Sequence, residues 1–297
     1  MYIEQLKKFK INSALYLVTI LGVLFFFGSN IVISFINDVD TNDMLKQSIE
    51  LMGKNLTFLS IIIPFAFLLI GLLLWVKFVL KQSITSLTTG RKKIDWKRIL
   101  FMFLIWGGFL TLTTLFTFII FPEDLIFQFN LSKFIPFFII AILFVPLQTS
   151  FEEYFFRGIF VQYIGLKTNS RFVPLILSSL IFGLLHFSNP EVGAMGSIIM
   201  IFYIGTGLIL GIMTLMDDGL ELSLGFHAAN NLVGAILVTS TTSVFQTDSV
   251  FLDVSKSISI YPMLIQVFVI YPLLLLLCSK KYKWNNWKQN LFGKLKE

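Results

Sequence analysis

The sequence predicts an all-α membrane protein, a polytopic helical bundle of about eight transmembrane helices. Hydrophobic residues make up 56% of the 297 residues and charged residues only 13%, whereas about 25% of a soluble domain is charged. Apolar runs long enough to cross a bilayer recur along the chain. The basic residues lie in short connecting segments and in the two tails, so the net charge of +6 indicates membrane orientation and not nucleic-acid binding.

The expected spans follow one another with short connections. In order they cover roughly residues 13–36, 57–80, 99–121, 134–165, 172–187, 197–216, 221–241 and 258–278. The first is too long for the apolar part of a signal peptide and lacks a small-residue cleavage site, so we expect it to be retained. The fourth is too long for one straight crossing, and we expect Pro146 to kink it. The fifth is short for a full crossing, so we expect its end to be shifted along the sequence or to lie below the membrane surface.

Charge alternates from one connection to the next. Lysine and arginine gather in residues 1–12, 81–98 and 167–171 and after residue 279, and the intervening loops are acidic or poor in lysine. This pattern predicts that both termini are cytoplasmic, although the acidic loop Asp217–Gly219 falls on the same side. A composition rich in Phe, Ile and Lys favours a bacterial plasma membrane as the location.

The tail after the single cysteine, Cys278, has two interpretations. Trp284, Trp287, Leu291 and Leu295 recur at helical spacing among lysines, which is typical of a helix lying in the membrane interface. A disordered basic tail is the alternative.

The motif Phe151–Gly158 places charge inside an apolar span. Glu153 and Arg157 are four residues apart and can pair on one helix face. Glu152 is rotated by about 100° from Glu153, so it remains free to act as a general base on water. A buried ion-pair cluster that only fixes helix packing is the structural alternative.

Two further polar patterns lie in later spans. Phe182 and His186 share one face at the end of the fifth span, where a histidine is more often a packed residue than a catalyst. His227 and Asn231 share a face of the seventh span and can donate hydrogen bonds to a developing oxyanion. A polar pair that joins two helices explains the second pattern equally well.

Together the three motifs Glu152-Glu153-x-x-x-Arg157, Phe182-x-x-x-His186 and His227-x-x-x-Asn231 resemble those of the CPBP intramembrane protease family. That family includes type II CAAX prenyl endopeptidases and bacterial Abi-type relatives. The resemblance implies that Glu152 activates water with help from His186. It also implies that His227 and Asn231 stabilise the oxyanion, while Glu153, Arg157 and Phe182 support the site.

The resemblance divides one integral membrane unit into three regions. Residues 1–133 form an N-terminal three-helix region, 134–241 the CPBP/Abi-like core, and 242–297 the last span and basic tail. The implied activity is a glutamic endopeptidase that needs no cofactor and cuts a membrane-associated or lipid-modified peptide or protein in the bilayer.

Two other hypotheses stay open. A metalloenzyme would hold zinc with Glu152, His186 and His227, since three protein ligands and a water form a catalytic zinc site; no HExxH motif supports it. A transporter or a catalytically silent scaffold or immunity protein is the non-enzymatic alternative, because intramembrane Glu and His also mark proton relays. Nothing in the sequence selects a substrate or an oligomeric state.

Overall fold

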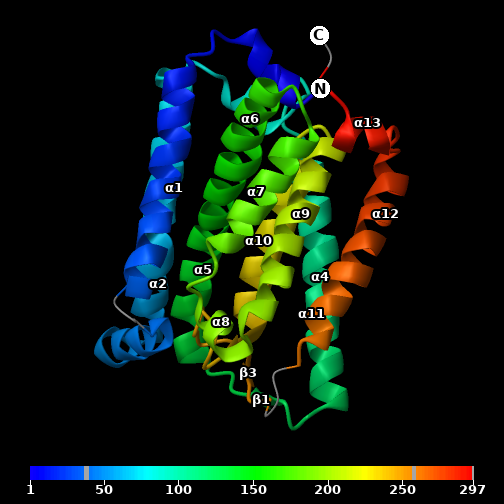
Figure 1. Cartoon of the computed structure of the whole chain (residues 1–297). Helices are drawn as coiled ribbons and strands as arrows, with labels where there is room; N and C mark the ends of the chain where they lie inside the picture. The colour runs from blue at the N-terminus through cyan, green and yellow to red at the C-terminus, as the bar shows by residue number, and fades with distance from the viewer. Residues whose placement is uncertain (37–39, 256–258, 296–297) are drawn as a thin grey trace.

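The computed structural model describes residues 1–36, 40–255 and 259–295. Its long helices run side by side and form a bundle (Figure 1). Residue 258, the predicted start of the last span, and the last two residues of the tail lie outside the described residues. Within the described part, six helices are long and apolar enough to cross a membrane. They are Ser13–Ile33, Thr41–Phe78, Trp96–Ile120, Leu131–Thr168, Ser197–Met216 and Tyr261–Tyr282. The chain is therefore a polytopic helical membrane protein.

The helices follow the predicted order. The α-helices are α1 (Ser13–Ile36), α2 (Thr41–Phe78), α3 (Ile84–Thr88), α4 (Trp96–Ile120), α5 (Leu131–Glu153), α6 (Val161–Thr168), α7 (Phe172–Leu184), α8 (Pro190–Met195), α9 (Met200–Met216), α10 (Glu221–Leu237), α11 (Tyr261–Ile265), α12 (Tyr271–Tyr282) and α13 (Trp287–Phe292). Short 3-10 helices cover Ile3–Lys8 and Ser197–Ile199, and π-helical segments cover Tyr154–Phe160 and Gln266–Ile270. Gly53, with φ of 78°, separates the first turns of α2 from its membrane part.

Two predicted spans are short helices, and one of them, α10, is largely surrounded by protein. α7 has 13 residues and α10 has 17, and α10 packs against α4, α5 and α9. Every residue from Glu221 to His227 is buried, whereas only 17% of the apolar window of α1 is buried within the protein. A helix surrounded by protein does not need the uniform apolar surface that lipid requires, so α10 can carry the polar motif.

The long fourth span departs from α geometry after the acidic pair. α5 continues as an α-helix through Pro146 and ends at Glu153, and the π-helical segment Tyr154–Phe160 links it to α6. The departure therefore begins directly after the acidic pair, within the motif, and does not coincide with Pro146. π-Helical turns are frequent at functional sites.

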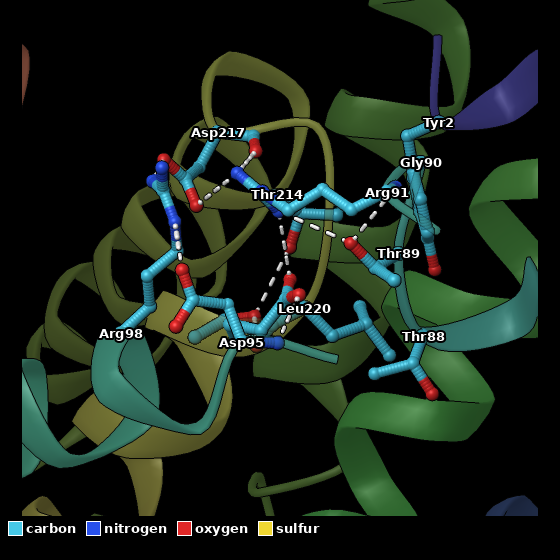
Figure 2. A network of polar contacts seen from close by, with 12 residues as sticks. Tyr2, Thr88, Thr89, Gly90, Arg91, Asp95, Arg98, Thr214, Asp217 and Leu220 are labelled. Carbon is cyan, nitrogen blue, oxygen red and sulfur yellow. Dashed lines mark hydrogen bonds and ion pairs between the residues drawn. The ribbon is translucent and has the colours of Figure 1, made fainter. Parts of the chain in front are cut away.

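The end that holds the chain termini is closed by a buried ion network (Figure 2). Arg91 contacts Asp217 at 3.0 Å and Glu221 at 3.1 Å, and Arg98 contacts Asp217 at 2.5 Å. The two arginines compensate the acidic loop that is out of place in the charge pattern. The Tyr2 hydroxyl donates to the carbonyl of Leu87 at 2.5 Å.

Tyr2 also links the start of α10 to the acidic motif. Its hydroxyl lies 3.1 Å from the carbonyl oxygen of Arg157, and its ring packs against Leu220, just before α10 begins. The N-terminal residues therefore pack between the beginning of α10 and the segment that carries Arg157.

The described part of the tail, up to Leu295, packs on the protein and contains the helix α13. Leu291 and Leu295 are buried with Ile3 and Leu215, and Trp287 packs against the same cluster. The apolar side chains at helical spacing thus contact the end of the bundle that holds the chain termini, and an interfacial position of this helix stays a prediction.

The opposite end carries a small sheet that the sequence did not predict. The strands are β1 (Leu125–Phe127), β2 (Val238–Ser240) and β3 (Phe251–Asp253), in the order β1-β3-β2. β3 pairs antiparallel with β1 and parallel with β2. The predicted seventh span, 221–241, therefore ends at Leu237, and its last residues form β2. α8 lies at the same end of the molecule (Figure 1).

Candidate active site

Glu153 and Arg157 form a completely buried ion pair at the base of the site. Arg157 Nη1 donates to Glu153 Oε1 at 3.0 Å, and neither side chain is exposed. Nη2 donates to the carbonyl of Gly207 in α9 at 3.0 Å, and the guanidinium lies 4.4 Å from the ring centre of Phe182 in α7. The pair expected from the i, i+4 spacing is thus present, and it fixes three helices around the motif.

His227 connects this pair to the other carboxylate. Its Nδ1 lies 2.8 Å from Glu153 Oε1, and its Nε2 lies 3.5 Å from Glu152 Oε2. An ionised carboxylate only accepts hydrogen bonds, so Nδ1 is the donor to Glu153. The longer gap to Glu152 exceeds a normal hydrogen bond.

A chain of hydrogen bonds that runs through one indole and three side-chain amides ends on Glu152. Trp106 Nε1 donates to Asn230 Oδ1 at 3.1 Å, Asn230 Nδ2 to Asn231 Oδ1 at 3.2 Å, and Asn231 Nδ2 to Gln148 Oε1 at 3.1 Å. Gln148 Nε2 then donates to Glu152 Oε1 at 2.5 Å. All four donors point the same way along the chain, and hydrogen bonds arranged in this way polarise one another. One oxygen of Glu152 is therefore held, and the side chain is oriented.

His186 lies beyond the end of α7. Its Nδ1 is 2.7 Å from the carbonyl oxygen of Phe182. Because a carbonyl accepts, Nδ1 carries the hydrogen, and Nε2 of a neutral ring is left as an acceptor. The ring stacks on Tyr203 of α9, with 4.6 Å between ring centres.

A cavity of about 540 Å³ brings these groups together. Glu152, His186, Asn231 and Phe182 all line it, and most of the remaining wall is apolar. His227 and Glu153 are not among the lining residues and lie behind Glu152. Glu152 Oε2 is buried and makes no hydrogen bond to any described residue. The wall of the cavity thus combines a carboxylate that has one unpaired oxygen with a histidine acceptor and an amide donor.

The metal hypothesis requires Glu152, His186 and His227 around one ion. Glu152 and His227 are neighbours, but among the described residues no three His, Cys, Asp or Glu side chains form a group that could hold a metal ion. The donor set therefore fits zinc poorly in this arrangement, and we derive no step through a metal.

The sequence analysis missed Gln148, Trp106 and the function of Asn230. Gln148 precedes Glu152 by four residues, which predicts a shared helix face, but an uncharged amide does not stand out in the way a charge does. Trp106 lies on α4, and only the packing of α4 on α10 brings it to Asn230.

Comparison with known proteins supports the resemblance. Residues 130–233 match the family model described as type II CAAX prenyl endopeptidase Rce1-like, which extends from just before α5 into α10. The chain is 37% identical over 183 residues to a Bacillus subtilis (strain 168) protein named uncharacterized protein YyaK, and the alignment covers 61% of each chain. No solved structure matches. The region that builds the site, residues 130–233, is thus similar to the family that the three motifs resemble, the Rce1-like type II CAAX prenyl endopeptidases.

Proposed function

We propose that the protein is an intramembrane endopeptidase that hydrolyses a peptide bond of a membrane-associated or lipid-modified peptide or protein with water activated by Glu152. The observation that carries the proposal is the position of Glu152. Its Oε1 is held by Gln148, while its Oε2 is buried, unpaired and beside a cavity of about 540 Å³. A general base must reach the proton that it removes, and this oxygen is the free one.

In the first step, Glu152 takes a proton from a water molecule in the cavity. The Nε2 atom of neutral His186 accepts the second hydrogen of the water and so orients its oxygen toward the scissile carbonyl carbon. The Nε2 atom of His227, 3.5 Å from Glu152 Oε2, is placed to share the proton that Glu152 has received. Glu153 fixes the orientation of His227 through Nδ1.

In the second step, the tetrahedral oxyanion needs donors. Asn231 Nδ2 uses one hydrogen for Gln148 and can direct the other to the oxyanion. Such a donor contributes about 10²–10³-fold to the rate. The resemblance implies that His227 also stabilises the oxyanion; since its ring lies behind Glu152, we assign the larger part to Asn231. Glu152 then returns its proton to the leaving amine, and the peptide bond breaks.

The test compares wild-type protein with Glu152→Gln at matched membrane abundance, by mass spectrometry of the termini of membrane and released peptides. Glu123→Gln, an exposed carboxylate in the loop before β1, is the matched control. A new terminus present with wild type and Glu123→Gln, and absent with Glu152→Gln, supports proteolysis. Identical peptides from all three, with any cellular phenotype retained by Glu152→Gln, would favour a scaffold or transporter instead.

The metal alternative has its own test. We expect purified protein to keep its cleavage activity after treatment with a strong zinc chelator. Loss of activity that added zinc restores would replace the proposal with a metalloenzyme.

We further propose that the protein resides in a bacterial plasma membrane with both termini cytoplasmic. The end that carries the 3-10 helix Ile3–Lys8, the α6–α7 turn and α13 is rich in lysine and arginine, as cytoplasmic loops are. Protease access to tags on either terminus, in intact and in opened cells, tests this orientation.

A further inference from the structure

The cavity contains a second unpaired carboxylate oxygen. Glu191 is the second residue of α8 and lines the same cavity as Glu152. Its Oε1 accepts a hydrogen bond from the backbone N–H of Val244 at 2.9 Å. Its Oε2 is buried and makes no hydrogen bond to any described residue. The mechanism proposed above does not use this side chain.

The neighbours of Glu191 connect it to the proposed catalytic groups. The Tyr203 hydroxyl lies near the Glu191 carboxyl and accepts a hydrogen bond from Asn189 Nδ2 at 3.2 Å. The ring of Tyr203 stacks on His186. A set of contacts therefore leads from the Glu191 carboxyl group through Tyr203 to His186.

Among the described residues, the wall of the cavity offers this carboxylate no positive charge. The described residues that line it include Glu152 and Glu191 but no lysine or arginine. Burial raises the pKa of Glu191, although the Val244 hydrogen bond opposes the shift. An unpaired carboxylate in an apolar cavity is costly, and a cation that enters removes that cost through a charge-assisted hydrogen bond.

The loops around this end add attraction of the same sign. Acidic side chains outnumber basic ones around the start of α2, before β1 and between β2 and α11; they include Asp40, Asp43, Glu123, Asp124, Asp248 and Asp253. α8, β1 and β3 gather at this end (Figure 1). Two of these acids are paired with lysines, Asp43 with Lys46 and Asp248 with Lys54. The net acidic charge that remains raises the local concentration of basic substrates.

From the unpaired oxygen, its contacts and the absence of a cation in the wall, we propose that Glu191 is a specificity subsite for a lysine or arginine side chain of the peptide substrate, close to the scissile bond. The inference rests on the proposed peptidase function, which it deepens by naming a substrate class: apolar peptides with a basic residue at one fixed distance from the cleaved bond.

The experiment uses full-length protein in liposomes and a set of end-blocked apolar peptides. Each peptide carries one lysine or arginine at a varied position, and a matched peptide carries norleucine or citrulline there. Wild type is expected to cleave the basic peptides with kcat/KM about tenfold or more above the neutral ones, at one fixed position. Glu191→Gln retains an oxygen for Val244 and is expected to lose this preference while it still cleaves neutral peptides. Glu191→Lys is expected to favour the same peptides with glutamate at that position.

A binding measurement separates the subsite from the chemistry. Glu152→Gln and the double variant Glu152→Gln/Glu191→Gln are titrated with the same peptides. If the single variant Glu152→Gln binds basic peptides more tightly than neutral ones and the double variant does not, the subsite is supported. This holds even if wild type cleaves none of the peptides, a result that would contradict only the peptidase proposal. Cleavage without preference, or a preference that Glu191→Gln retains, would overturn the subsite and leave the peptidase proposal standing. Neither cleavage nor selective binding would overturn both.

Discussion

Arg157 tests whether the buried ion pair holds the site together. Arg157→Met removes the guanidinium and keeps an unbranched apolar side chain. It eliminates the contact to Glu153 at 3.0 Å, the hydrogen bond to the Gly207 carbonyl at 3.0 Å and the contact with Phe182. Glu153 then remains completely buried with His227 as its one described partner.

Breaking a buried pair by removing one partner costs about 3–5 kcal/mol, because an uncompensated charge stays in the interior. At a few degrees per kcal/mol, the midpoint of thermal unfolding in detergent is expected to fall by roughly 10 °C. The assay follows the fluorescence of the five tryptophans during heating of purified wild type and variant at equal concentration.

The double variant Glu153→Gln/Arg157→Met gives the decisive comparison. Gln at position 153 removes the unpaired charge and still offers an oxygen to His227 Nδ1. The double variant should therefore have a higher midpoint of thermal unfolding than the single variant Arg157→Met. Equal midpoints for wild type and Arg157→Met would refute the reasoning. A double variant less stable than the single one would show that the cost does not come from the unpaired Glu153.

Three further predictions concern other positions. Gln148→Leu removes the donor to Glu152 and the acceptor for Asn231, so we expect kcat/KM for peptide cleavage to fall by about 10²–10³-fold at unchanged folded yield; an unchanged rate would contradict the positioning of Glu152 by the amide chain. Gly207→Ala places a Cβ 2.8 Å from the Ser179 carbonyl oxygen and should cost about 1–3 kcal/mol in thermal unfolding, whereas Gly108→Ala, where nothing lies within 4 Å, should not destabilise. Burial raises the pKa of Asp217 from 3.8 to about 6 although Arg91 and Arg98 oppose it; the folded protein therefore binds this proton more tightly than the unfolded chain. Stability relative to Asp217→Asn should rise by up to about 3 kcal/mol as the pH falls from about 6 to about 4, and parallel pH profiles of the two proteins would contradict this.

The sequence predicted the parts of the site that rest on local geometry. The i, i+4 spacing predicted the pair of Glu153 and Arg157, and the structure contains it. The three motifs meet as expected, since Glu152, His186 and Asn231 line one cavity. Their catalytic roles and the division of the chain into three regions stay predictions.

What the sequence did not predict depends on contacts between distant segments. Tyr2 packs against Leu220 at the start of α10 and lies 3.1 Å from the carbonyl oxygen of Arg157, and no spacing within α10 indicates these contacts. Leu291 and Leu295 have the pattern of an interfacial helix whether they face lipid or the core. Glu191 was counted only as one acid in a loop, because a carboxylate that faces a cavity and one that faces water look the same in sequence.

The burial of α10 has a consequence for how the protein is made. A 17-residue segment with Glu221, His227, Asn230 and Asn231 has little tendency to partition from a translocon into lipid alone, since each polar group costs free energy there. Most of its surface is covered by α4, α5 and α9, and those helices are synthesised first. We therefore expect α10 to enter the bilayer by packing on helices that are already present. Insertion of α10 would then also complete the site. A chain that lacks α4 would fail at insertion, before any question of catalysis arises.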